Sequence, residues 1–387
     1  MSDGEGQTNK GKFSRRQILQ TGGVLAGAAI LPMPAIIGKA NAADAKDAFK
    51  GEEMTVCAWS GGYLDSFKTA ISDPFNEKYG TKVSLVGGWD QMVAQMKAAP
   101  PGKPPFDITV SEEYTTLGAL AEGLYAKSDR SKFPQLADVQ PFFLTARPES
   151  ARDYGVPLGL GFSLPLLNTA LTADKPLSWS TMWDKDLEGK LALDAGAYWW
   201  LIAISAIWGA KKDFNAFYDW KPGLASDPIF DALERLRPAK YYKDGAELSF
   251  LMLQEQASFA QIYSSDALGL MQNGGATYKT GIPADGTVAY GDWYIKVKGT
   301  QHNALADMFL GYLLEKDTQN HFIQVQMSVM SRKDVTVPSF WHNYPVTNDD
   351  LVKNVRLMTM AGLERLLPNF DAMGDRFQKA VLKTSKG

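Results

Sequence analysis

Stretches that suit a buried β-strand alternate with stretches that suit an amphipathic helix along most of this chain. Residues 54–59 are a short apolar run, and residues 64–71 place apolar side chains on one helical face. The same order returns at residues 82–86 and 91–98, and a third strand-like run follows at 106–110. Because such alternation builds layers of helices on a sheet, we expect an α/β fold.

Two extended, glycine-containing segments are expected to cross between two lobes. The chain has 387 residues, which is more than a single hydrophobic core normally serves. Residues 155–168 are extended and apolar, and residues 291–298 have the same character. We therefore expect one lobe from residues 54–160 and 295–387, and a second lobe from residues 161–294.

The N-terminal region has the features of an export signal. Arg15 and Arg16 lie side by side in a basic stretch that precedes an apolar run with two prolines. This run is too irregular for the ~20 apolar residues of a spanning helix, and small residues follow it, as a signal peptidase requires. We expect residues 1–42 to be a twin-arginine signal peptide that is cleaved after Ala42 and followed by a linker at 43–53. The mature protein would be periplasmic; an uncleaved anchor is the alternative.

The charge of the chain argues against a nucleic-acid partner. Residues 1–42 carry five basic and two acidic residues, so their removal lowers the formal charge from −3 to −6. Binding to phosphate backbones depends on clustered Lys and Arg, and no basic run remains after the signal. We expect no nucleic-acid binding.

Cysteine and histidine are too sparse for a disulfide framework or a zinc site. Cys57 is the only cysteine and lies in an apolar run, so we expect a packed core thiol. The histidines, His302, His321 and His342, lack the spacing of zinc ligands. We expect neither a metal nor a cofactor.

Four short patterns together resemble the periplasmic solute-binding proteins of ABC transporters, most closely the spermidine/putrescine-binding branch. They are the turn after the first strand at 59–64, the strand and tyrosine at 106–114, the Tyr-x-x-Pro crossing at 154–161, and the Trp-rich segment at 178–183 with its Gly-Lys-Leu continuation at 187–191. The resemblance implies a two-lobed, type II-like periplasmic-binding-protein fold with the ligand in a cleft between the lobes. It also implies a small-molecule ligand, an inner-membrane ABC permease as partner, a monomer and no enzymatic activity.

The resemblance also implies a cage of aromatic rings and carboxylates for a cationic, polyamine-like solute. Tyr114 matches a cleft tyrosine of that branch, and Tyr290 with Asp292 matches an aromatic-x-acid pair on the second crossing. The chain departs from the branch after Asp194, where small residues replace further acids. Aromatic faces attract cations by roughly 0.5–2 kcal/mol per ring, although each of these rings also suits a protein core. The candidate ligand-binding residues are Trp59, Tyr63, Glu113, Tyr114, Tyr198, Tyr263, Asp266, Tyr290, Asp292 and Trp293.

Three alternatives remain open from the residues alone. Backbone and hydroxyl donors at 60–62 and 264–265 suit the carboxylate of a zwitterion, and the adjacent pair Tyr241 and Tyr242 suits a ferric ion. A secreted hydrolase is the third alternative. The chain has no G-x-S-x-G, H-E-x-x-H or P-loop motif, which argues against that class.

Overall fold

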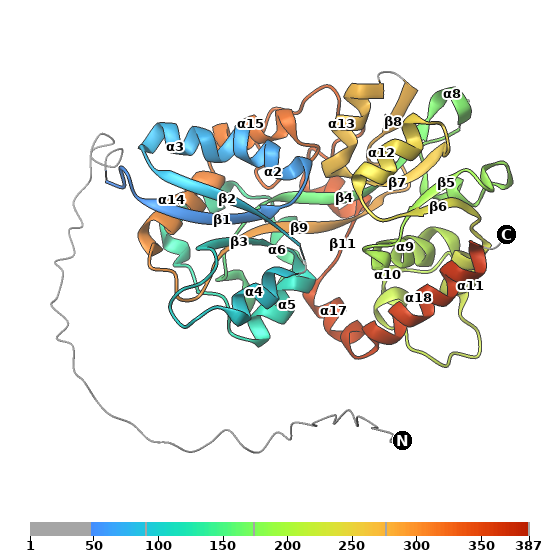
Figure 1. Ribbon diagram of the computed structural model, residues 1–387, viewed down its shortest axis with the longest axis horizontal. Helices are drawn as coiled ribbons and strands as arrows, with labels where there is room; N and C mark the ends of the chain where they lie inside the picture. Colours follow the sequence, from blue (N-terminus) through green and yellow to red (C-terminus); the bar gives the residue numbers. More distant parts are fainter. Residues whose placement is uncertain (1–47, 90, 173–174, 275–276, 386–387) are drawn as a thin grey trace, which may run out of the picture. The chain divides into compact units, whose positions relative to one another are not determined.

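A mixed β-sheet runs through the computed structural model, with helices on both of its sides (Figure 1). The structure describes residues 48–89, 91–172, 175–274 and 277–385, so the predicted signal peptide lies outside the described residues. The strands are β1 (Glu53–Trp59), β2 (Lys82–Gly88), β3 (Ile108–Ser111), β4 (Val156–Asn168), β5 (Leu191–Asp194), β6 (Pro238–Tyr242), β7 (Phe259–Tyr263), β8 (Tyr278–Thr280), β9 (Thr287–Lys296), β10 (Val329–Met330) and β11 (Val355–Leu357).

The helices connect these strands in the order that the sequence pattern predicts, which confirms the α/β class. The α-helices are α2 (Gly62–Phe67), α3 (Asp73–Tyr79), α4 (Gln91–Ala98), α5 (Glu113–Ala121), α6 (Phe142–Thr145), α7 (Glu149–Arg152), α8 (Thr169–Thr172), α9 (Tyr198–Ile204), α10 (Phe214–Tyr218), α11 (Pro228–Arg235), α12 (Gly245–Leu253), α13 (Ser264–Gly274), α14 (Asn303–Leu313), α15 (Lys316–Val325), α16 (Asn348–Asn354), α17 (Met360–Leu366) and α18 (Phe370–Thr384). The π-helical segments are η1 (Lys68–Ser72) and η6 (Ser205–Gly209), and the 3-10 turns are η2 (Arg130–Lys132), η3 (Pro134–Asp138), η4 (Trp179–Trp183), η5 (Lys185–Leu187) and η8 (Leu367–Asn369).

The sheet joins two parallel parts through a central antiparallel pair. Its order is β2-β1-β3-β9-β4-β7-β5-β6. β1 pairs in parallel with β2 and β3, and β5 pairs in parallel with β6 and β7. The long strands β4 and β9 pair antiparallel between these parts, and β4 has an irregular register opposite Trp293 and Asp292, between Pro157 and Gly159. The two segments expected to cross between lobes are therefore neighbouring strands.

Buried apolar side chains form two clusters. One surrounds β1, β3 and β9 and includes Phe67 and Phe309, whereas the other lies against α9, α11 and α18 and includes Trp179 and Phe230. Cys57 belongs to the first cluster, where burial raises the pKa of its thiol to about 11, as expected for a core residue. The exact boundaries proposed for the two lobes stay a prediction.

Short turns bring several helices to the carboxyl ends of the parallel strands. Gly61 adopts a positive φ of 79° between β1 and α2, a conformation that a side chain disfavours. Glu112 lies between the end of β3 and the start of α5. Its side chain accepts hydrogen bonds from backbone N–H groups in the first turn of α5. α13 follows β7 directly at Ser264. These turns place the first residues of α2, α5 and α13 beside the central strands.

Candidate functional site

Asp292 is a buried acid in the middle of β9, and it is held by a tryptophan from β1. The Trp59 Nε1–H donates to Asp292 Oδ1 over 2.7 Å, and the two residues are 6% and 1% exposed. Burial raises the pKa of the Asp292 carboxyl to about 7; the Trp59 hydrogen bond opposes this, and the nearby Glu113 charge adds to it. The structure thus brings together two of the predicted ligand-binding residues.

Tyrosines surround this acid on the same face of β9. Tyr290, Asp292 and Tyr294 alternate along the strand, so their side chains point to one side. Tyr63, in the first turn of α2, is buried and accepts a hydrogen bond from the Tyr294 hydroxyl over 3.3 Å. Burial and the Asp292 charge raise the pKa values of Tyr63 and Tyr290 well above the ordinary value, so both hydroxyls stay neutral donors.

Asp266 brings a second carboxylate toward Tyr290 from the start of α13. The Asp266 charge contributes to the raised pKa of Tyr290. Burial raises the pKa of Asp266 itself to about 6, and the charges of Asp244 and Asp194 add to this. Within the described part of the chain, the Asp266 carboxylate has neither a salt bridge to a cation nor a hydrogen bond, and it lies against Gly245, where a Cβ would be 2.7 Å from Oδ2.

Tyr263 is hydrogen-bonded to Asp194, an acid that is not among the candidate ligand-binding residues from the sequence. Its hydroxyl donates to Asp194 Oδ2 over 2.6 Å, and the Gly196 N–H donates to Asp194 Oδ1 over 2.7 Å. Burial raises the pKa of Asp194, whereas these hydrogen bonds lower it. Asp194 therefore fixes Tyr263 and the turn before α9.

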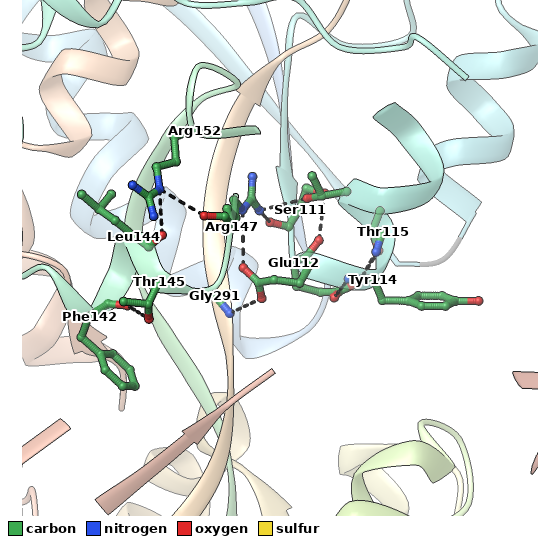
Figure 2. A network of polar contacts seen from close by, with 12 residues as sticks. Ser111, Glu112, Tyr114, Thr115, Phe142, Leu144, Thr145, Arg147, Arg152 and Gly291 are labelled. Atoms are coloured by element: carbon green, nitrogen blue, oxygen red, sulfur yellow. Dashed lines mark hydrogen bonds and ion pairs between the residues drawn. The ribbon is translucent and has the colours of Figure 1, made fainter. Parts of the chain in front are cut away.

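Glu113 and Trp293 contact Arg147 and so belong to a different group of residues. Figure 2 shows the polar contacts around Arg147. Glu113 Oε1 lies 3.5 Å from Arg147 Nε, and Glu113 Oε2 accepts from the Gly291 N–H over 3.0 Å. The Arg147 guanidinium lies 4.1 Å from the Trp293 ring centre. Because neighbouring side chains of a strand point to opposite faces, Trp293 lies on the other side of β9 from Asp292.

Arg147 comes from the loop after α6, far in sequence from the residues that it binds. Its Nη2 donates to the Ser111 carbonyl over 3.0 Å and to Thr116 Oγ1 over 2.9 Å, and its side chain is fully buried. Arg147 is not among the candidate residues from the sequence, and no periodic signal in the loop indicates it. The arginine is engaged by Glu113, so its charge is already balanced.

Tyr114 and Tyr198 lie in an aromatic group at the start of α9. The Tyr114 ring is 4.8 Å from Phe370 and 5.9 Å from Trp199. The Tyr198 ring is 5.3 Å from Phe377 of α18, and burial raises the pKa of Tyr198 to about 12. These two predicted residues therefore lie together, in contact with α9 and α18.

The tyrosine pair considered for iron is engaged in other contacts. Tyr241 Oη lies 2.8 Å from Thr384 Oγ1, and the Tyr242 hydroxyl donates to the Gln261 carbonyl over 2.7 Å. Both residues are buried. The residues that the structure describes contain no group of three or more His, Cys, Asp or Glu arranged for a metal ion.

Two hollows have volumes of about 450 and 380 Å³, and neither includes a predicted ligand-binding residue. Lys175 and Lys190 line the first hollow, and Lys82 and His302 line the second.

Helices long and apolar enough to cross a membrane are lacking among the residues described.

Comparisons with known proteins agree with this architecture. The γ-aminobutyric acid-binding protein of Pseudomonas aeruginosa is 23% identical over 277 residues, which are 70% of this chain and 75% of that protein. The spermidine/putrescine-binding protein PotD of Streptococcus pneumoniae superposes with a TM-score of 0.71 at 15% identity, over 86% of this chain and 100% of that chain. AgtB of A. tumefaciens R10, in complex with agropinic acid, gives 0.62 at 17% identity, over 86% and 99%.

The family itself follows from the sequence model that the chain matches. That model describes a bacterial extracellular solute-binding protein, and the match covers residues 70–347, which is most of the chain. The fold of the solved structures is the one that the resemblance implies. The chain therefore belongs to the bacterial extracellular solute-binding proteins, the extracytoplasmic components of ABC transporters that bind solutes and are not enzymes.

Proposed function

We propose that the protein captures a small solute bearing an ammonium group, in the manner of a polyamine-binding protein, and delivers it to an inner-membrane permease. The observation that carries the proposal is Asp292, a buried carboxylate hydrogen-bonded by Trp59 and lying near Tyr63 and Tyr290. No cation pairs with Asp292 among the described residues. An ammonium group would supply the missing charge through a charge-assisted hydrogen bond.

The balance of buried charge supports a cationic solute. Asp292, Asp266 and Asp194 are acids with raised pKa values around the same strands, whereas Arg147 is already paired with Glu113. Burial makes an unpaired carboxylate costly, so these acids favour a cation that enters with the ligand. The charges of both Asp292 and Asp266 act on Tyr290. The Tyr290 ring also offers an aromatic face to a cation.

The names of the relatives support a ligand with an amine, but they do not decide whether the ligand also carries a carboxylate. One relative binds γ-aminobutyric acid, and one neighbour is named for spermidine and putrescine. All three molecules carry an ammonium group. A zwitterion is therefore the second candidate, and the relative in Pseudomonas aeruginosa is the observation that favours it. Ligands with and without a carboxylate separate the two candidates.

The direct test is calorimetric titration of the purified protein with putrescine, 4-aminobutanoate and butanoate. Binding of either amine without binding of butanoate supports the proposal, and binding of butanoate alone contradicts it. Asp292→Asn should weaken amine binding about ten- to a hundred-fold, because a hydrogen bond to a charged group contributes about 1.5–3 kcal/mol. Asp219→Asn is the matched control: this acid pairs with Arg365 at the surface.

We further propose that the protein reaches the periplasm by the twin-arginine route, is cleaved near Ala42 and acts as a monomer. Replacing Arg15 and Arg16 with lysine should block export, because the arginine pair is the signal that this translocon reads. Fractionation of cells that express each form tests the route. Periplasmic protein at the parental level in the lysine variant would contradict it.

A further inference from the structure

Trp89 is the one tryptophan of ten that the described structure leaves exposed. It follows the end of β2, and 49% of its surface is open to solvent. Its ring stacks on Trp59, with 5.6 Å between ring centroids and 29° between ring planes. Trp59 in turn donates its indole N–H to Asp292. A chain of two contacts therefore leads from a surface ring to the buried acid.

Two glycines allow the end of β2 to bring Trp89 to this place. In the parallel register, Gly88 lies opposite Trp59. A Cβ at Gly88 would lie 2.5 Å from Met92 Cγ and 2.6 Å from Cys57 Sγ, and a Cβ at Gly87 would lie 2.7 Å from Ser60 Oγ. A side chain at Gly88 would require Cys57 of β1 or Met92 to move, and a side chain at Gly87 would require Ser60 to move. Gly88 in particular therefore allows the close approach of β2 to β1.

The position of Trp89 suits a functional role better than a role in stability. A large ring that is half in water gives up much of the free energy that its burial would contribute. The Trp59 contact is a stacked pair, and such pairs contribute beyond their buried area. What the contact restrains is the plane of the Trp59 indole, and this plane determines where its N–H points.

We propose that Trp89 is a positioning residue for the ammonium site: its ring holds the Trp59 indole so that the N–H stays on Asp292. This inference rests on the proposed function for its effect on ligand affinity, but its structural part is independent of any ligand. By covering one face of Trp59, Trp89 also keeps water from competing for the Trp59–Asp292 hydrogen bond. A drier site strengthens that bond and the charge interactions beside it.

The first test uses no ligand. In protein labelled with nitrogen-15, the Trp59 indole N–H signal is assigned by its loss in Trp59→Phe, and its exchange with water is measured. Trp89→Ala should speed this exchange roughly two- to ten-fold, the factor that corresponds to one aromatic pair, and Trp89→Phe should restore slow exchange because it keeps a stacked ring. Equal exchange in the parent and Trp89→Ala would overturn the inference.

The second test is a thermodynamic cycle with putrescine and 4-aminobutanoate as probes. Trp89→Ala should weaken binding roughly two- to ten-fold in the parent, and the same substitution should have almost no effect in the Trp59→Phe background. An equal loss in both backgrounds would mean that Trp89 acts without Trp59, which contradicts the inference. If the exchange test succeeds but neither probe binds the parent, the proposed function fails while the positioning role stands.

Discussion

Gly161 of β4 lies directly against the ring of Tyr290 of β9, its partner in the antiparallel register. A Cβ at Gly161 would be 2.1 Å from Tyr290 Cζ, so no side chain fits there while the ring keeps its place. The Tyr290 ring also contacts the Trp200 ring, with 5.3 Å between the ring centroids. The absence of a side chain at Gly161 thus decides where a central residue of the proposed site lies.

Gly161→Ala should therefore displace Tyr290 and weaken amine binding. We expect a loss of about 1–3 kcal/mol in the free energy of unfolding, which is typical of an overpacked core, together with a lower affinity. Gly118→Ala is the matched control, since a Cβ at Gly118 would meet nothing within 4 Å. Urea unfolding and calorimetric titration measure both effects. Parental affinity in Gly161→Ala would contradict the assignment of Tyr290 to the site.

The raised pKa values of the acids predict a pH dependence of opposite sign for stability and for binding. Asp292 and Asp266 have pKa values of about 7 and about 6 in the folded protein, above the ordinary value of 3.8. The folded state therefore holds protons that the unfolded state has released, so their contribution to stability falls as pH rises from about 4 to about 7. Over the same range the acids ionise, and the affinity for an ammonium group should rise.

Two measurements check this prediction. The melting temperature of the empty protein should fall less steeply with pH in Asp292→Asn than in the parent, since the amide does not titrate. Titration with putrescine at pH 6.5, in buffers of different ionisation enthalpy, should show protons released on binding. Uptake of protons, or an affinity that falls as pH rises from 5 to 7, would be the wrong sign.

Breaking the Arg147–Glu113 pair should destabilise the protein strongly. Both side chains are fully buried, so Arg147→Met leaves an uncompensated carboxylate next to β9. We expect a loss of about 3–5 kcal/mol in the free energy of unfolding, and Arg147→Met combined with Glu113→Gln should recover part of it. Urea unfolding of the parent and the three variants provides the double-mutant cycle. Additive losses would show that the two charges are not coupled.

Trp59 and Asp292 are only 6% and 1% exposed, so entry of a ligand to the proposed site would require a change of conformation. If the two lobes open about the crossing strands, small-angle scattering should give a smaller radius of gyration with saturating putrescine than without it. Protein refolded from denaturant serves as the control, since it has lost any solute retained during purification. An unchanged radius in the refolded protein would contradict lobe closure.

Much of the fold could be predicted because apolar runs bounded by glycine and proline are local signals. The strand predicted at 54–59 coincides with β1, and the strand predicted at 106–110 overlaps β3, after which α5 begins. The pairing of Trp59 with Asp292 could not be predicted in the same way. The two residues are 233 positions apart, and only the strand order brings them together.

The residues that sequence reasoning missed lack a local pattern. Arg147 lies in a loop, and its ion pair with Glu113 depends on the packing of α5 against β9. Trp89 follows two glycines, a pattern that is typical of a turn and does not indicate a binding site. Glu113 and Trp293 are candidate residues of the cage that the resemblance implies, whereas the alternation of side chains along β9 puts Trp293 on the opposite face from Asp292.

The irregular register of β4 opposite Asp292 has a mechanical consequence. β4 and β9 are neighbouring strands in the middle of the sheet, and the register shift between Pro157 and Gly159 bends β4 locally beside Asp292. The proposed ammonium acceptor thus lies beside this bend and not at an end of β9. A solute bound there would stiffen the bend itself, so binding and the loss of local flexibility would be one event.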